Sequence, residues 1–139
     1  MLRLATVLLL LSLGTEWALA ENEPQRVVCE IPTAESIPTV LKGIQEHLAS
    51  SKTPLQVVVV TYGKGANFLL EGAKDEDGRP FAPQVQTLVA QNVQFRVCET
   101  TAKFQNIDPS KVIPEGKIVP SGRKEVERLQ KEEGYVLLN

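Results

Sequence analysis

The sequence predicts an α/β domain with a doubly wound, mostly parallel five-stranded sheet and helices on both of its faces. Two observations lead to this fold class. Segments of strand character alternate along the chain with segments in which apolar residues recur at helical spacing. Residues 57–60 are four consecutive valines, a run typical of a strand that is buried on both faces of a parallel sheet.

The first half of the chain is expected to supply two strands and two helices. Residues 26–31 form the first strand, and a turn follows. Ser36 caps a helix in which Val40, Leu41, Ile44 and Leu48 fall on one face, and the polar segment 50–54 ends it. Residues 55–61 form the second strand. After a glycine-rich turn, a short helix is expected at residues 66–72.

The second half repeats the alternation. A charged, exposed loop at residues 74–80 precedes a helix at 81–91, a third strand at 93–97 and a short helix at 100–105. An irregular loop leads to a fourth strand. Ser121 caps the final helix, and Gly134 ends it. The fourth and fifth strands are expected at residues 117–119 and 135–138.

The first twenty residues have the pattern of an export signal. Arg3 precedes an apolar run, and small residues at Ala18 and Ala20 suit signal peptidase, so cleavage is expected after Ala20. The alternative is an N-terminal anchor that is not cleaved. Cleavage leaves residues 21–139 as one α/β domain in the periplasm or another extracytoplasmic space. No later apolar segment is long enough to insert into a membrane.

Composition argues against several classes of function. The net charge is −2 and no basic patch is evident, so neither nucleic acid nor an anionic membrane surface is an expected partner. His47, the only histidine, has no Cys or His nearby, which predicts a solvated helix residue and no metal site. Gly63-Lys64-Gly65 is too short for a phosphate loop, and Ser121 lacks a nucleophile-elbow frame, so neither a cofactor nor a hydrolase triad is expected.

Cys98 is the candidate functional residue, because it stands where the third strand ends and a helix begins. Ligands of open parallel sheets bind beyond the carboxyl ends of the strands, and helix amides favour a thiolate. Lys64 would also favour the thiolate, whereas the adjacent Glu99 would oppose it. The residues expected to line this site are Tyr62, Gly63, Lys64, Glu99, Thr100, Thr101, Ser121 and Gly122. The alternative is that Cys98 is a small buried apolar residue.

Cys29 lies inside the first strand, where a core residue is expected. A disulfide between Cys29 and Cys98 would require the two strands to be neighbours, and neighbouring strands of a sheet seldom meet disulfide geometry. The sequence leaves both states open. The absence of a C-x-x-C motif argues against a thioredoxin-type redox site.

Several segments, taken in order, resemble the DsrE/DsrF-like family with its YchN-like fold, and within it the exported single-domain branch. They are residues 57–63 (VVVVTYG), 95–101 (FRVCETT), 119–122 (VPSG) and 129–135 (LQKEEGY). The resemblance implies homo-oligomers, often trimers or hexamers, and sulfur handling, with a persulfide carried on the cysteine matched by Cys98. Two departures are Tyr62, where many exported relatives have His, and Thr100, where Asn is common.

Two functions are therefore expected as alternatives. In the first, the protein is a periplasmic sulfur carrier in a sulfur relay, at most sulfurtransferase-like, and Cys98 exchanges sulfane sulfur with donor and acceptor proteins. In the second, the protein is a non-catalytic oligomeric binding or assembly module, and Cys98 is structural.

Overall fold

The four valines at residues 57–60 lie in β2 (Leu55–Thr61), the central strand of a five-stranded sheet. Val57 and Val59 belong to the apolar cluster on one face of the sheet, and Val58 and Val60 belong to the cluster on the other. The valine run is therefore buried on both faces, as the sequence predicted. The computed structural model describes residues 23–138.

The sheet has the strand order β4-β3-β2-β1-β5, and every described pairing is parallel. The doubly wound α/β fold is thus confirmed, with a sheet that is wholly parallel. The strands other than β2 are β1 (Gln25–Ile31), β3 (Val93–Cys98), β4 (Gly116–Val119) and β5 (Val136–Leu137).

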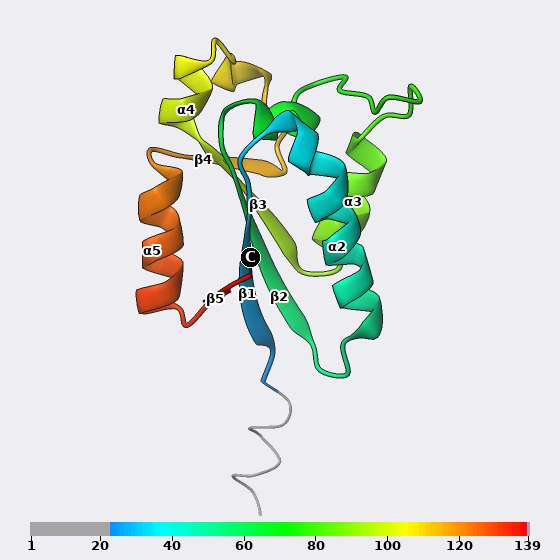
Figure 1. The fold of residues 1–139 in the computed structure, drawn as a ribbon, viewed down its shortest axis with the longest axis vertical. Helices are drawn as coiled ribbons and strands as arrows, with labels where there is room; N and C mark the ends of the chain where they lie inside the picture. Colours follow the sequence, from blue (N-terminus) through cyan, green and yellow to red (C-terminus); the bar gives the residue numbers. More distant parts are fainter. Residues whose placement is uncertain (1–22, 139) are drawn as a thin grey trace, which may run out of the picture.

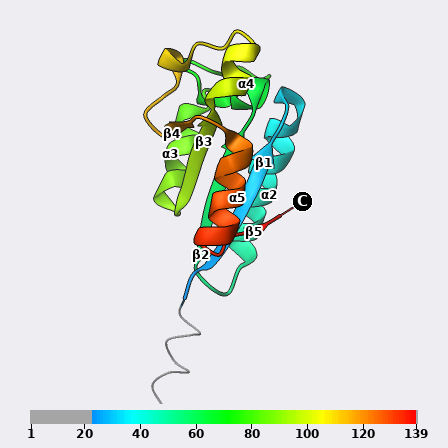
Figure 2. The same cartoon turned by 90° about the vertical axis from the view of Figure 1, so that its left-hand side faces the viewer.

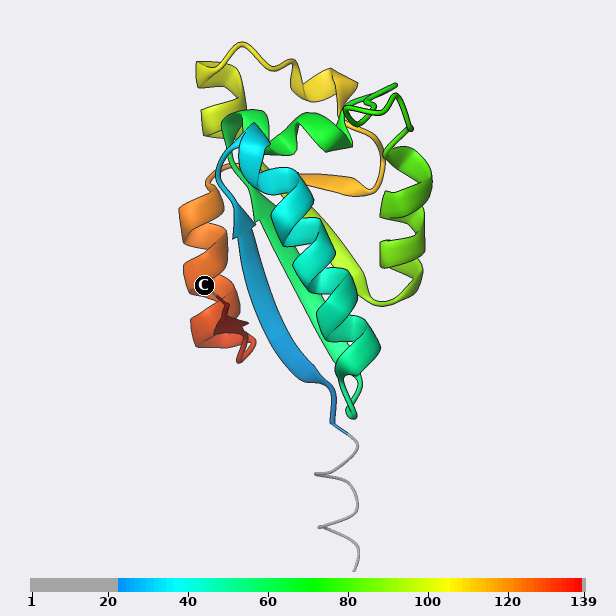
Figure 3. The same ribbon diagram turned by 45° about the vertical axis from the view of Figure 1, so that its right-hand side comes forward.

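Helices cover both faces of the sheet, but unequally. On one face lie α2 (Ile37–Ser50) and α3 (Ala82–Ala90), which stand side by side in Figure 3. On the other face lies α5 (Gly122–Glu132), which Figure 2 shows alone in front of the strands. A further helix, α4 (Glu99–Phe104), sits at the end of the sheet where β1, β2 and β3 finish (Figure 1).

The segment after β2 differs from the prediction. In place of a short helix at residues 66–72, a 3₁₀ helix, η2 (Gly63–Leu69), begins directly after Tyr62. Gly63 takes a positive φ of 49°, which favours glycine. A Cβ on Gly65 would lie 2.2 Å from the carbonyl oxygen of Ile31, so only glycine lets η2 cross so close to β1. This tight turn keeps η2 at the carboxyl end of the sheet.

Smaller differences concern the loops and the last strand. Two further 3₁₀ helices, η1 (Ala34–Ser36) and η3 (Pro109–Lys111), lie in segments predicted to be a turn and an irregular loop. β5 has two residues, fewer than expected, because Tyr135 packs into the core beside α5 and does not pair with β1. Val136, which lies on this edge strand, is 60 % exposed.

The predicted export signal, residues 1–20, lies outside the described residues. Within residues 23–138, none of the helices is both long enough and apolar enough to cross a bilayer.

Candidate functional site

Cys98 is the last residue of β3 and the N-cap of α4, and its side chain is only 3 % exposed. It pairs with Val119 at the end of β4, and the chain then passes through Pro120 and Ser121 into α5. The carboxyl ends of two neighbouring strands and the first turns of two helices therefore meet at one thiol. This is the edge of the sheet at which the sequence placed the site.

Hydrogen-bond donors surround the sulfur atom of Cys98. Burial raises the pKa of this thiol, but hydrogen bonds from the hydroxyl and the backbone amide of Thr101 lower it. The backbone amides of Gly122 and Thr100 lower it further, and the net effect holds the pKa of Cys98 below its ordinary value. The donors come from the first turn of α4, the helix start that the sequence placed beside the thiol, and from the start of α5.

The Thr101 hydroxyl is held in place from two sides. It accepts a hydrogen bond from the backbone amide of Gly63 at 3.0 Å, and it lies 3.3 Å from the carbonyl oxygen of Cys98. Because a hydroxyl proton rotates freely, it can point to this carbonyl when Cys98 is a thiol and to the sulfur when Cys98 is a thiolate. Thr101 thus links η2 to the thiol.

Tyr62 forms part of the cover over the thiol. It follows Thr61, whose register partner is Val97, so Tyr62 and Cys98 are lateral neighbours at the ends of β2 and β3. A Cβ on Gly122 would lie 2.6 Å from Cε1 of Tyr62, which places the ring directly against the start of α5. Burial raises the pKa of Tyr62, and so do its hydrogen bond to Glu30 and the negative charge of Glu30. The phenol therefore keeps its proton.

The remaining residues expected at the site have other contacts. Lys64 is exposed, and its backbone amide donates to the Gln105 side chain at 2.9 Å. Glu99 pairs with Lys103 at 2.8 Å. Ser121 caps α5, as predicted, by accepting from the amide of Lys124.

Two open pockets flank the thiol. One, of about 440 Å³, lies beyond Tyr62 and is lined by Glu30, Pro32, Tyr62, Arg123, Val126, Glu127 and Leu137. The other, of about 590 Å³, lies between β4 and α5 and includes Thr100, Ser121 and Lys124 in its lining. Cys98 lines neither pocket. Of the eight predicted lining residues, Tyr62 lines the first pocket and Thr100 and Ser121 line the second, whereas the other five line neither of them.

Cys29 lies on the opposite face of the sheet from Cys98. It is in register with Val59, and Val59 with Phe95, so the row containing Cys29 faces α2 and α3. Burial raises the pKa of Cys29 to about 11. Both cysteines are free, and β2 lies between their strands, so the structure does not form the disulfide that the sequence left open.

His47 is not the solvated helix residue that the sequence predicted. Its Nε2 atom is buried and, among the described residues, has no hydrogen-bond partner. The side chain lines a mainly apolar pocket of about 490 Å³ between α2 and β1, together with Cys29 and Leu138. Residues 23–138 contain no group of three or more His, Cys, Asp or Glu side chains that could hold a metal ion.

Glu30, Arg96 and Glu125 contribute to the site region without having been predicted there. Glu30 could have been found, because it stands at the end of β1 on the same edge as Cys98. A charged residue between Phe95 and Val97 is a signal for Arg96, since such a side chain is rarely buried unless it is paired. Nothing local in the sequence indicates its partner.

The fold and the site define a class of protein: small doubly wound α/β domains with a covered thiol at the carboxyl edge of the sheet. The sequence profile of the DsrE/DsrF-like family matches residues 16–139. The chain belongs to the DsrE/DsrF-like family, as the sequence motifs indicated.

Solved structures confirm the fold. A protein of unknown function from Methanobacterium thermoautotrophicum, MTH1491, superposes with a TM-score of 0.68 at 22 % identity, covering 82 % of this chain and 97 % of that one. The ychN protein from E. coli superposes with a TM-score of 0.58 at 19 % identity, covering 82 % and 99 %. Among curated proteins, no match was found.

Proposed function

We propose that this protein is an exported, periplasmic sulfur carrier that holds sulfane sulfur as a persulfide on Cys98. The observation that carries the proposal is the set of donors around the sulfur, which come from Thr100, Thr101 and Gly122 and favour the thiolate. A thiolate is the form of cysteine that attacks sulfane sulfur. Family membership supports a role in sulfur relay.

The proposed exchange balances without any added oxidant. The Cys98 thiolate attacks the outer sulfur of a donor persulfide, R–S–SH, forming a bond from its own sulfur to that outer sulfur. The bond between the two donor sulfurs breaks, and the donor leaves as the thiolate R–S⁻. In the second half, an acceptor thiolate attacks the outer sulfur of the Cys98 persulfide and releases the Cys98 thiolate. Donor and acceptor are proposed to be thiol-bearing proteins.

The cover over Cys98 fits a carrier outside the cytoplasm. Such a carrier has to escape oxidation to a disulfide in an oxidising compartment. Because Cys98 is only 3 % exposed, a thiol of another protein does not easily reach it. Cys29 lies on the opposite face of the sheet, so the chain itself does not supply a partner thiol for a disulfide. Transfer then requires a local opening of the cover, and Tyr62, which lines an open pocket, is a candidate for the side chain that moves.

The test is the intact mass of the mature chain after incubation with inorganic polysulfide. We expect one added sulfur atom on the wild type and on Cys29→Ala, and none on Cys98→Ser. Release of that sulfur to an added small thiol would complete the relay. Absence of added sulfur on the wild type, or equal addition to Cys98→Ser, contradicts the proposal.

The burial of Cys98 also favours a second candidate, a non-catalytic homo-oligomeric module in which the thiol only packs against its neighbours. Trimers or hexamers, which the family resemblance suggests, fit either candidate. In the second case, neither cysteine of the native protein accepts sulfur, and Cys98→Ala changes stability alone. Fractionation of cells expressing the full chain tests the proposed periplasmic location independently of both candidates.

A further inference from the structure

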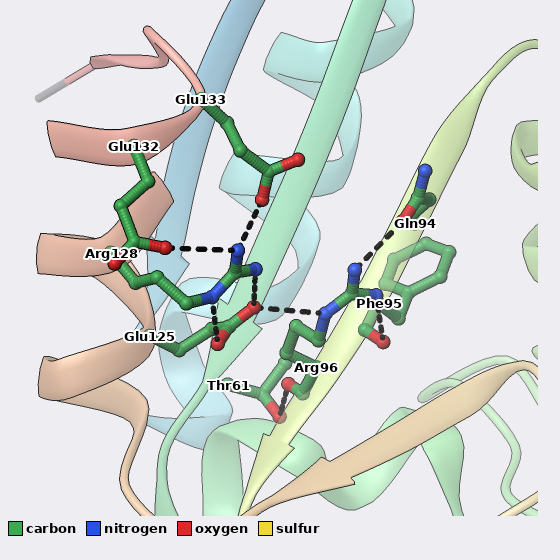
Figure 4. Close-up of polar contacts among 8 residues, drawn as sticks. All are labelled: Thr61, Gln94, Phe95, Arg96, Glu125, Arg128, Glu132 and Glu133. Carbon is green, nitrogen blue, oxygen red and sulfur yellow. Dashed lines mark hydrogen bonds and ion pairs between the residues drawn. The ribbon is translucent and has the colours of Figure 1, made fainter. Parts of the chain in front are cut away.

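An ion pair joins β3 to α5 close to the thiol. Nε of Arg96 lies 3.4 Å from Oε1 of Glu125, and the two side chains are only 10 % and 11 % exposed (Figure 4). A charged pair that is buried to this degree is costly to desolvate, so it is a weak explanation for stability by itself. Its position relative to the thiol suggests a more specific role.

The ion pair lies next to the contact between α5 and the thiol, both along β3 and along α5. Arg96 precedes Cys98 by two residues in β3, so the two side chains lie on the same face of the strand. Glu125 follows Gly122 by three residues in α5, so both lie on the same side of the helix. The Gly122 amide faces the Cys98 sulfur, and one helical turn later Glu125 faces Arg96.

Both charged side chains are themselves held. Nη2 and Nε of Arg128 contact the two carboxylate oxygens of Glu125 at 2.7 and 3.1 Å, and Nη1 of Arg128 contacts Glu133 (Figure 4). These contacts and that with Arg96 hold the pKa of Glu125 below its usual value, so the carboxylate is charged.

On the strand side, the guanidinium of Arg96 donates to the side chain of Gln94 at 2.7 Å and to the carbonyl oxygen of Phe95 at 3.3 Å. The carbonyl oxygen of Arg96 itself accepts from the Thr61 hydroxyl at 2.8 Å, which ties this part of β3 to the central strand β2. Neither partner of the ion pair is therefore free to swing away.

We propose that Arg96 and Glu125 are positioning residues, whose ion pair fixes α5 against β3 so that the Gly122 amide stays directed at the Cys98 sulfur. α5 is the one helix on this face of the sheet within the described residues, and its packing against the strands is mainly apolar. Besides the Gly122 amide at the thiol, one polar contact lies at its far end, where Arg26 of β1 donates to the carbonyl oxygen of Glu133 at 2.9 Å. Apolar packing by Val126 and Leu129 keeps α5 on the sheet. It fixes the position of the helix along its own axis less strictly than an ion pair, because apolar contacts are not directional. The inference rests on the proposed use of the Cys98 thiolate.

The direction in which the pKa of Cys98 shifts in a Glu125 variant distinguishes a positioning role from a direct effect of the Glu125 charge on the thiol. Removing the negative charge of Glu125 favours the thiolate through space and would lower the pKa of Cys98. Loss of the Gly122 hydrogen bond disfavours the thiolate and would raise it. For Glu125→Ala we expect a rise of about one pKa unit, the size of one hydrogen bond to a charged group.

The experiment is the pH dependence of alkylation of the mature chain, with each cysteine followed by peptide mass spectrometry. Glu125→Gln carries the same charge change but still offers an oxygen to Arg96, so we expect a smaller rise. Glu132→Ala removes a charge from the same helix, and its one described contact is with Arg128 at 4.0 Å, so we expect no shift. The other ionisable groups near the thiol, Tyr62 with Glu30 behind it, Arg123 on α5 and the Glu99–Lys103 pair, are unchanged in all three variants.

A fall of the Cys98 pKa in Glu125→Ala, no change, or equal shifts in Glu125→Ala and Glu125→Gln would overturn the inference. If Glu125→Ala does not fold, Glu125→Ser takes its place, since its side chain is also too short to reach Arg96, and the same rise is expected. Polysulfide loading of the wild type is measured in parallel. If the pKa of Cys98 rises in Glu125→Ala but the wild type takes up no sulfur, sulfur carriage is contradicted and the positioning role stands. If the wild type takes up sulfur but the pKa does not rise in Glu125→Ala, the positioning role is contradicted and sulfur carriage stands.

Discussion

The phenol oxygen of Tyr62 lies 2.6 Å from Oε1 of Glu30, so the residue that follows β2 is tied to the carboxyl end of β1. The ring between these ends rests against Gly122 at the start of α5. One hydrogen bond therefore holds a side chain that separates the covered thiol of Cys98 from an open pocket of about 440 Å³.

Tyr62→Phe removes this hydrogen bond and keeps the ring. We expect the free energy of unfolding to fall by about 1 kcal/mol and the alkylation of Cys98 at neutral pH to become several-fold faster, because the cover opens more often. Tyr135→Phe is the matched control, since Tyr135 is buried on the same face beside α5 and has no described contact with the thiol. Equal alkylation rates in both variants would show that the Tyr62–Glu30 contact does not control access.

Gly122→Ala tests the contact between the ring and the helix. A Cβ here would meet Cε1 of Tyr62 at 2.6 Å and Cγ1 of Val60 at 3.0 Å, so the ring has to move. We expect a loss of about 1–3 kcal/mol in the free energy of unfolding, together with faster alkylation of Cys98.

The control for this change is Gly43→Ala in α2, where an added Cβ has no atom within 4 Å. It should stabilise the protein by about 0.5–1 kcal/mol, because alanine favours a helix over glycine, and leave alkylation unchanged. Chemical denaturation and thiol alkylation of the two variants measure both effects. If Gly122→Ala leaves the free energy of unfolding unchanged, the ring of Tyr62 does not pack closely against the start of α5.

The fold could be predicted because its signals are local. The valine run of β2 and the apolar spacing of α2 each report burial within a few residues, and strands that alternate with helices form parallel sheets. The segment after β2 could not be predicted. Its 3₁₀ helix depends on Gly65 passing Ile31, and these residues meet only after β1 and β2 have paired.

For the candidate site, too, the locally encoded part could be predicted and the long-range contacts could not. The position of Cys98 at the end of β3 and the start of α4 could be predicted, because a strand end followed by a helix start is visible in the sequence. The Glu30–Tyr62 and Arg96–Glu125 contacts were missed because their partners are 32 and 29 residues apart. The order of the strands in the sheet and the placement of α5 bring these residues together, and neither is set by local periodicity.

Thr101→Val removes the hydroxyl that accepts from the Gly63 amide and donates toward Cys98. We expect the pKa of Cys98 to rise and the free energy of unfolding to fall by about 1–3 kcal/mol, because the Gly63 amide loses its acceptor. Thr101→Ser keeps the hydroxyl, so we expect the wild-type pKa of Cys98 and the wild-type free energy of unfolding. Thr100→Val is the control for the pKa, since the Thr100 hydroxyl donates to the carbonyl oxygen of Pro120 and the amide near the thiol is retained. The same shift in Thr100→Val would mean that the Thr101 hydroxyl has no specific effect on the thiol.

The two thiols should separate in a pH titration of alkylation rate. Surrounding donors hold the pKa of Cys98 below the ordinary 9.0, whereas burial raises the pKa of Cys29 to about 11. Because only the thiolate is alkylated, raising the pH from neutral should modify Cys98 first and Cys29 only in strongly alkaline solution. Exposure alone predicts the opposite order, since Cys29 is 8 % exposed and Cys98 only 3 %. In denaturant the two midpoints should converge on the ordinary value, because both effects depend on the fold. Coincident midpoints in the native protein would mean that the donors around Cys98 do not favour its thiolate.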